Sequence, residues 1–203
     1  GVENMTRGPW VISKASKPFG RDSKMEDSSF GWRFINPKMQ KIYGTEGMGQ
    51  TAENLVEKYD INRGDQDAFA YHSQMKAALA QKEGTFENEI VPVEIPQRKA
   101  DPIIFKNDEF LKPHTSIEGL AKLKPAFKKE GTVTAGNSSG LNDGSAAMLI
   151  ASENGVKIHN LNPLARIVAS AVVGVEPRIM GIGPVQAAKK ALTKAGLTMD
   201  EID

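Results

Sequence analysis

Apolar side chains recur at helical spacing over residues 62–84, and this pattern predicts a long helix with one apolar face. Asn62 is a suitable N-cap, because its side chain can accept a hydrogen bond from a free backbone N–H in the first turn. Gly84 favours the end of the helix. The apolar face comprises Ala68, His72, Met75 and Leu79.

A second helix is predicted over residues 183–196. Pro184 suits the first turn, where a missing N–H costs nothing, and Gly196 is a typical C-terminal stop. The buried stripe comprises Val185, Ala188, Leu192 and Ala195.

Shorter helices are predicted over residues 51–59 and in the stretch SIEGLAKLKPAF, where the helix should stop before Pro125. No single period holds over residues 13–50, so we expect irregular structure there with one short helix.

Three stretches predict strands. Residues 86–95 alternate apolar and polar positions, but Pro92 cannot donate a ladder hydrogen bond and assigns this strand to an edge or a bulge. Residues 145–152 and 163–177 are continuously small or apolar, which is typical of strands buried on both faces. Residues 96–114, rich in Pro, Asp and Lys, predict a loop. Strands followed by loops and helices indicate an α/β architecture.

The stretch GTVTAGNSSGLNDGSAAMLIAS, residues 131–152, places two turns of small residues directly before one of these apolar runs. Glycine lets another group approach the backbone closely, and Asn, Asp and Ser form turns by bonding to their own backbone. The stretch is either a tight structural loop or a loop shaped around a ligand, and its residues alone leave both open.

Composition excludes several classes of protein. The 203 residues carry a net charge of +1, so no basic field is present to bind nucleic acid or an anionic membrane surface. No apolar run approaches the ~20 residues of a membrane span. Cysteine is absent, which removes disulfides, thiolate metal ligands and a cysteine nucleophile from these residues and favours a cytoplasmic protein.

Candidate chemistry is sparse. Gly181 and Gly183 lie between an apolar run and a helix, as in dinucleotide-binding loops, but the third glycine is missing and a close-packed corner explains them as well. Ser138 and Ser139 lack the G-x-S-x-G context of a nucleophilic serine. The acids at Glu26 and Asp27 form no metal-ligand spacing, so we expect no metal site.

The order of several motifs closely resembles the thiolase family. These motifs are GVENMTRGPWV, MGQTAEN, DQDAFAYHSQMKA, NEIVPV, KLKPAF, GTVTAGNSSGLNDGSAAMLIAS, PLARI and MGIGPVQAAKKAL. Within the family, GWRFINPKM followed by YGTEGM, together with IPQRKADPIIF and EPRIMGIGP, is most similar to the 3-oxoadipyl-CoA thiolases of aromatic-acid breakdown. An acetyl-CoA acetyltransferase is the near alternative.

The resemblance implies a thiolase-like fold, with two layered αβαβα halves and a loop domain inserted in the first half, of which this chain would be the middle. Residues 1–9 and 142–158 would end the first half. Residues 10–141 would form the loop domain, and residues 159–203 would start the second half. Thiolases are usually homodimers or homotetramers, and residues 13–33 would make the tetramer contact.

The resemblance also implies coenzyme A-dependent acyl transfer, either thiolytic cleavage of a 3-oxoacyl-CoA or the reverse condensation. The thiolase nucleophile would lie upstream of GVENM, and the catalytic histidines and second cysteine downstream of DEID. None of the catalytic residues therefore maps onto this chain, and we expect the chain alone to be inactive. With partner strands missing, it should aggregate or need the remaining segments.

What the resemblance places on this chain is part of a coenzyme A site, with coenzyme A and acyl-CoA as substrates and no tightly bound cofactor. Ser139 matches the serine that hydrogen-bonds the pantetheine amide, and Ala135 the residue against which the pantetheine arm lies. Phe127 matches an apolar wall of the tunnel. The remaining positions are Met48 and Met180 at the acyl end, and Met39 and Lys112 at the adenine end.

Two residues depart from the thiolase pattern, and two other classes of protein remain as alternatives. Lys112 replaces an arginine found beside the nucleotide in many thiolases, and a lysine cannot bind a phosphate as a fork. Gly47 replaces a histidine found in some members. A non-catalytic thiolase-like coenzyme A-binding protein, and a nucleotide-binding oxidoreductase domain built on Gly181 and Gly183, are the alternatives from other classes.

Overall fold

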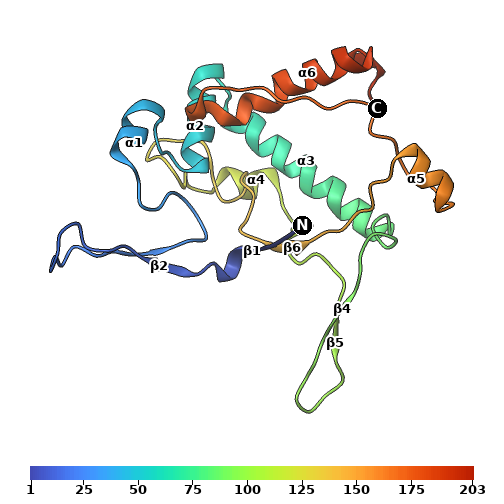
Figure 1. Ribbon diagram of the computed structural model, residues 1–203, viewed down its shortest axis with the longest axis horizontal. Helices are drawn as coiled ribbons and strands as arrows, with labels where there is room; N and C mark the ends of the chain where they lie inside the picture. The colour runs from blue at the N-terminus through green and yellow to red at the C-terminus, as the bar shows by residue number, and fades with distance from the viewer. The chain divides into compact units, whose positions relative to one another are not determined.

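The computed structural model describes all 203 residues, which divide into two compact units. Unit 1 comprises residues 1–58 and 141–203, and unit 2 comprises residues 59–140. Figure 1 labels most of the helices and strands of both units. The chain mixes helices and strands, as the α/β prediction requires.

Short antiparallel strand pairs organise the N-terminal part of unit 1. β1 (Val2–Asn4) pairs with β6 (Asp143–Ser145), so that Val2 lies opposite Ser145 and Asn4 opposite Asp143. β2 (Trp10–Ile12) pairs with β3 (Met25–Asp27) in a hairpin that follows the short 3₁₀ turn η1 (Met5–Arg7).

Unit 1 also contains four α-helices. They are α1 (Pro37–Tyr43), α2 (Met48–Tyr59), α5 (Glu153–Ile158) and α6 (Gly183–Ala195), with 3₁₀ turns η2 (Pro177–Ile182) and η3 (Met199–Glu201). Gly196 ends α6 at a φ of +71°, in the left-handed region that glycine enters without strain. The predicted helices over 51–59 and 183–196, and the short helix expected within 13–50, are confirmed.

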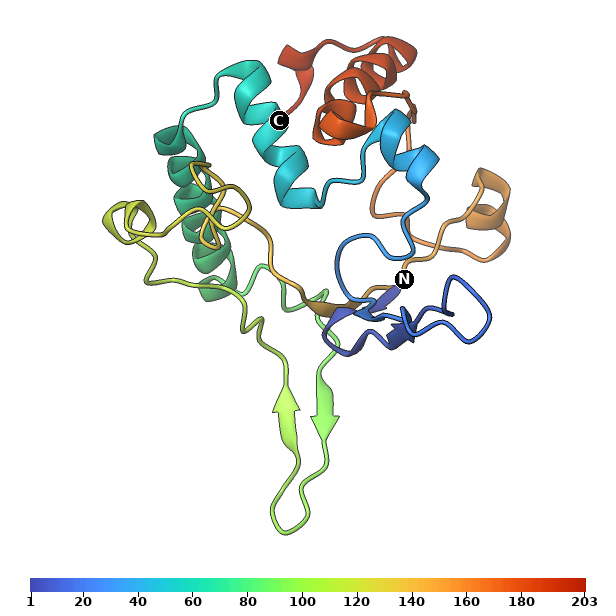
Figure 2. The ribbon, with the colours of Figure 1, turned by 90° about the vertical axis from the view of Figure 1, so that its left-hand side faces the viewer.

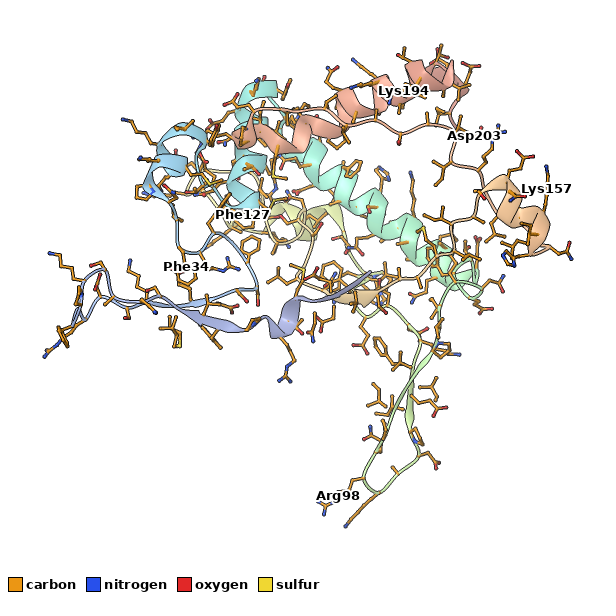
Figure 3. All side chains as sticks on the ribbon, viewed as in Figure 1. Phe34, Arg98, Phe127, Lys157, Lys194 and Asp203 are labelled. Atoms are coloured by element: carbon orange, nitrogen blue, oxygen red, sulfur yellow. The ribbon has the colours of Figure 1, made fainter.

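Unit 2 is built on the long helix α3 (Arg63–Lys82), which carries the predicted cap: the Asn62 side chain accepts a hydrogen bond from Asp65 N at 2.9 Å. β4 (Val93–Ile95) and β5 (Ile103–Phe105) form an antiparallel hairpin, visible as two arrows in Figure 2. Arg98 marks its tip in Figure 3. α4 (Ile117–Ala121) completes the unit. The prediction of an unbroken loop over 96–114 is therefore wrong where β5 forms.

The two predicted buried strands are also wrong. Only Ser145 of residues 145–152 belongs to a strand, and residues 163–176 form none. Met148 is 83 % exposed and Leu164 is 100 % exposed. The reason is that a strand buried on both faces needs neighbouring strands and covering helices. Ser145 pairs with Val2 and Ala146 with Gly1, but no strand pairs with the rest of these runs.

The buried apolar core is small. Leu120 and Val133 are its members in unit 2, and Ile179 is its member in unit 1. Several buried positions are instead polar, among them Thr51, Asp67 and Thr134. Because buried polar groups need partners, the architecture around the candidate site is set by hydrogen bonds. No helix combines the length and the apolar character that a membrane span requires.

Candidate functional site

The small-residue loop of unit 2 is held in place by the side-chain amide of Asn137. Asn137 Oδ1 accepts a hydrogen bond from Thr134 N at 2.7 Å. Asn137 Nδ2 donates to Thr132 O at 3.1 Å and to Asp67 Oδ1 at 3.0 Å. One side chain thus closes the turn and ties it to α3, which explains why an amide, with both donor and acceptor, occupies this position.

The Thr134 side chain completes the turn from inside. Thr134 is fully buried, and its Oγ1 accepts hydrogen bonds from Gly136 N at 3.2 Å and Asn137 N at 3.3 Å. A Cβ at Gly136 would lie 2.5 Å from both Leu120 Cδ2 and Leu123 Cδ1. Position 136 therefore requires glycine because the backbone packs directly on apolar side chains.

An ion pair anchors this network to the rest of unit 2. Arg63 Nε lies 2.7 Å from Asp67 Oδ2, and the Asp67 carboxylate is buried. Arg63 Nη2 also donates to the backbone oxygens of Leu120 and Leu123, at 2.6 and 3.1 Å. A buried carboxylate is stable only with such partners. Charge-assisted hydrogen bonds of Arg63 and Asp67 therefore join α3, α4 and the loop, which are far apart in the sequence.

This framework presents two of the expected coenzyme A residues at the surface. Ala135 and Ser139 are both exposed on the loop, on either side of the Asn137 bracket. Phe127, labelled in Figure 3, is half-buried in the neighbouring stretch, where Ala126 N donates to Val133 O at 2.9 Å. The stretch that carries Phe127 is therefore hydrogen-bonded to the start of the loop that carries Ala135 and Ser139.

Ser138 differs from its neighbour. Its Oγ is enclosed and has no hydrogen-bond partner, whereas Ser139 is exposed. A buried hydroxyl without a partner is unfavourable. The two adjacent serines are therefore in opposite environments, and only Ser139 is available to an external ligand.

Lys112 lies on an exposed loop of unit 2. Its backbone N donates to Gln74 Oε1 at 2.9 Å, which fixes the loop to α3. Its Nζ is 3.4 Å from Glu109 O and 6.0 Å from the centroid of the Phe110 ring. The ammonium makes only these long contacts, so it remains able to meet an anion as a point charge.

Unit 1 contains a cavity of about 380 Å³. Met48 of α2 and Met180 of η2 both line it, although they lie 132 residues apart in the sequence. The aromatic part of the lining comprises Phe30, Trp32 and Tyr43. Met39, on α1, is not part of this lining and is partly exposed.

The corner that holds Met180 is packed closely on α2. Asn54 Nδ2 donates to Arg178 O at 2.8 Å. A Cβ at Gly181 would lie 2.8 Å from Leu55 Cδ1, so this glycine permits close packing. This contact supports the interpretation of Gly181 as a packing residue over that of a nucleotide-binding glycine.

Arg178 and Glu46 form an ion pair beside the cavity, with Arg178 Nε 2.5 Å from Glu46 Oε1. Both residues also line a second cavity of about 480 Å³, and Gly44, Thr45 and Glu46 line both cavities. The sequence did not single out this pair. The motifs YGTEGM and EPRIMG contain it, but nothing in their spacing indicates that they meet.

The first cavity also has a fixed carboxylate near its rim. Ser29, a lining residue, donates its backbone N–H to Asp27 Oδ1 at 2.8 Å. This hydrogen bond, supported by the Ser29 side chain and the Arg33 charge, holds the pKa of Asp27 below its usual value. Asp27 therefore stays ionised at neutral pH and cannot serve as a proton donor there.

Comparison with known proteins gives a consistent result. The model of the thiolase N-terminal domain matches residues 1–154, and that of the thiolase C-terminal domain matches residues 161–203. A β-ketoadipyl-CoA thiolase of Acinetobacter baylyi is 54 % identical over 203 residues, which are 100 % of this chain and 51 % of that protein. The 3-oxoadipyl-CoA/3-oxo-5,6-dehydrosuberyl-CoA thiolase of Escherichia coli is 48 % identical, also over 100 % of this chain and 51 % of that protein.

Solved structures of thiolases are similar to this chain as well. Human mitochondrial 3-ketoacyl-CoA thiolase in complex with CoA superposes with a TM-score of 0.86 at 42 % identity, covering 100 % of this chain and 49 % of that chain. The acetyl-CoA acetyltransferase of Bacillus anthracis gives 0.82 at 40 % identity, covering 100 % and 50 %. The chain spans about half the length of the relatives that it matches. It has the thiolase fold over that span, and it belongs to the thiolase family.

Proposed function

We propose that this chain is part of a thiolase that cleaves 3-oxoadipyl-CoA with coenzyme A. The observation that carries the proposal is the 54 % identity, over all 203 residues, to a relative named β-ketoadipyl-CoA thiolase. In the reaction the bond between C2 and C3 of the acyl chain breaks. C3 leaves as an acyl thioester, and C2, after taking up a proton, becomes the methyl group of acetyl-CoA.

The role of these residues is to bind coenzyme A and the acyl chain. None of them is a cysteine, so the thiolate that takes the acyl group has to come from outside the 203 residues. Ser139 and Ala135 sit on a loop already fixed by Asn137 and Thr134. A preorganised loop can hydrogen-bond a pantetheine amide without the entropic cost of ordering itself on binding.

The other expected contacts divide between the two ends of the ligand. Phe127 would form an apolar wall for the pantetheine arm. Met48 and Met180, which share one cavity, would contact the acyl chain. Lys112 would meet a phosphate at the nucleotide end, and Met39 would contact the adenine. One hydrogen bond contributes only about 1 kcal/mol net, so affinity has to come from the whole set.

A homotetramer is the proposed assembly, with residues 13–33 at the contact between subunits. These residues form most of the β2–β3 hairpin, which exposes Phe19 at its far end. An exposed aromatic side chain on a protruding hairpin is typical of a surface that another protein covers. If this is correct, Phe19→Ser in the full-length protein should convert tetramers to dimers in light scattering. An unchanged mass would contradict the contact.

The full-length protein that contains this chain is the material for testing the activity. We expect it to convert 3-oxoadipyl-CoA and coenzyme A to succinyl-CoA and acetyl-CoA, measured by chromatography of the thioesters. A relative from Chromobacterium violaceum named acetyl-CoA acetyltransferase is 50 % identical, so acetoacetyl-CoA is the competing substrate. A higher kcat/KM for acetoacetyl-CoA would favour that second function. Coenzyme A binding without turnover of either thioester would favour a non-catalytic protein.

A further inference from the structure

We propose that Arg178 binds the free carboxylate at the far end of the acyl chain and selects thioesters of dicarboxylic acids. The proposal rests on the proposed function and adds a residue to it. A 3-oxoadipyl chain is six carbons long and ends in an ionised carboxylate, and this charge distinguishes it from 3-oxohexanoyl, which ends in a methyl group. A site that prefers the former needs a cation at a set distance from the reacting carbons.

The guanidinium of Arg178 has the free hydrogen-bond donors that such a site needs. Its Nε donates to Glu46 Oε1, and its two terminal nitrogens donate no hydrogen bond within the chain. The Arg178 side chain is 55 % exposed, whereas that of Glu46 is 20 % exposed. Glu46 therefore orients the arginine from the protein side, and the open edge of the guanidinium can take a second carboxylate as a fork.

The backbone around Arg178 is fixed as well. Its carbonyl oxygen accepts the 2.8 Å hydrogen bond from Asn54 Nδ2 of α2. Gly44 adopts φ +74° and ψ 167°, and a Cβ there would collide with the Glu46 carboxylate and lie 3.2 Å from Arg178 Cγ. The ion pair therefore packs against the backbone of Gly44. Because the Arg178 side chain is already held in place, it loses less conformational entropy when a ligand binds.

The position of Arg178 matches the path of an acyl chain. Met180, two residues along η2, lines the 380 Å³ cavity with Met48, while Arg178 lines the 480 Å³ cavity. Gly44, Thr45 and Glu46 border both. A chain whose carbons lie against the two methionines can pass this shared border and place its terminal oxygens at Arg178.

The charge around the two cavities favours an anion. Their cationic lining residues are Arg33, Lys41 and Arg178, whereas the carboxylates are that of Glu46 in the lining and that of Asp27 near the rim of the first cavity. Arg33 is occupied with the backbone oxygens of Phe30 and Gly31. An excess of positive charge in a partly enclosed space raises the local concentration of an anionic group and rejects a cationic one.

The test compares two thioesters of equal length in the full-length protein. Arg178→Met should lower kcat/KM for 3-oxoadipyl-CoA by about 10- to 100-fold, the loss expected when one charged hydrogen-bonding partner is removed. The kcat/KM for 3-oxohexanoyl-CoA should stay the same or rise. Arg178→Lys should fall between the two, because it keeps the charge and loses the fork. Arg98→Met, the same substitution on the β4–β5 hairpin, should change neither value.

The outcomes separate the two proposals. An equal loss for both thioesters would mean that Arg178 serves packing only, and would overturn the inference while leaving the proposed function intact. Unchanged kcat/KM for 3-oxoadipyl-CoA would overturn it in the same way. If the unaltered protein cleaves 3-oxohexanoyl-CoA but not 3-oxoadipyl-CoA, the substrate class is wrong. If it cleaves neither, the proposed function is refuted and the inference with it.

Discussion

Asn137 Nδ2 donates a hydrogen bond to Asp67 Oδ1 at 3.0 Å, although 70 residues separate the two in the sequence. The Asp67 carboxylate is buried and receives its other contact from Arg63. A single amide thereby couples the loop that carries Ser139 to the longest helix of unit 2. The loop's shape is set by α3 as much as by its own glycines.

Replacing Asn137 should therefore loosen the loop. Asn137→Ala removes the acceptor for Thr134 N and leaves the buried Asp67 carboxylate with one partner fewer. We expect the free energy of unfolding of the full-length protein to fall by about 2–3 kcal/mol, the usual cost of leaving buried polar groups unsatisfied. Denaturant titration measures this. Asn107→Ala, in an exposed bend of unit 2, is the control and should have almost no effect. A loss below 0.5 kcal/mol at Asn137 would show that the network is not stabilising, since about that much is typical of surface substitutions.

Two adjacent serines provide a matched pair for the coenzyme A proposal. Ser139→Ala should raise the KM for coenzyme A by about 5-fold, the equivalent of one hydrogen bond of about 1 kcal/mol, with little change in stability. Ser138→Ala should leave that KM unchanged, because its Oγ is enclosed. It should also keep or slightly raise the stability, since a hydroxyl without a partner is removed. Equal effects of the two substitutions on KM would contradict the assignment of Ser139 to the ligand.

The contrast between these networks and the helices shows what the sequence can and cannot predict. α3 and α6 were predicted with their caps at Asn62 and Gly196, because capping depends on residues within one turn of the helix end. The prediction of strands over 145–152 and 163–177 was wrong. An apolar run indicates that its side chains favour burial, but it does not indicate which other segment would cover them.

In the candidate site, too, local features were predictable and contacts between distant residues were not. The motif AGNSSG indicated the loop around Ser139, since small residues in a turn form a local signal. Two other features could not be predicted from the sequence. The Asp67–Asn137 bond spans 70 residues and the Glu46–Arg178 pair spans 132. Contacts of this kind depend on the tertiary fold, and a single sequence carries no pattern from which to infer them.

Gly44 offers a test of the arginine site that leaves both charged residues in place. At φ +74° and ψ 167° the backbone is in a region that only glycine occupies readily, and a new Cβ would collide with the Glu46 carboxylate. Gly44→Ala should lower the free energy of unfolding by about 1–3 kcal/mol and should reduce the preference for 3-oxoadipyl-CoA over 3-oxohexanoyl-CoA. Gly174→Ala is the control, because a Cβ there meets nothing within 4 Å. Retained preference in Gly44→Ala would show that Glu46 is not needed to orient Arg178.

The pairing of β1 with β6 predicts a pH effect. Thr6 Oγ1 donates to Asp143 Oδ2 at 2.6 Å, and Thr6 N donates to Oδ1 at 2.9 Å. These hydrogen bonds, first that of the Thr6 side chain and then that of its backbone, hold the pKa of Asp143 below its usual value. A lowered pKa in the folded state means that the contribution of Asp143 to stability is complete above the pKa of the unfolded chain, about 3.9. It is lost as the pH falls through the folded-state pKa.

Thr6→Val should therefore raise the pKa of Asp143 towards its usual value, because the strongest donor to the carboxylate is removed. The loss of stability on acidification should become smaller in the variant, since less stabilisation of the charged carboxylate is left to lose. Carboxyl chemical shifts followed by NMR from pH 6 to pH 2 measure the pKa directly. Thr115→Val is a suitable control, because the Thr115 hydroxyl donates to Lys112 O and contacts no carboxylate. An Asp143 pKa that is the same in Thr6→Val and in the unaltered protein would mean that the backbone N–H of Thr6 alone lowers it.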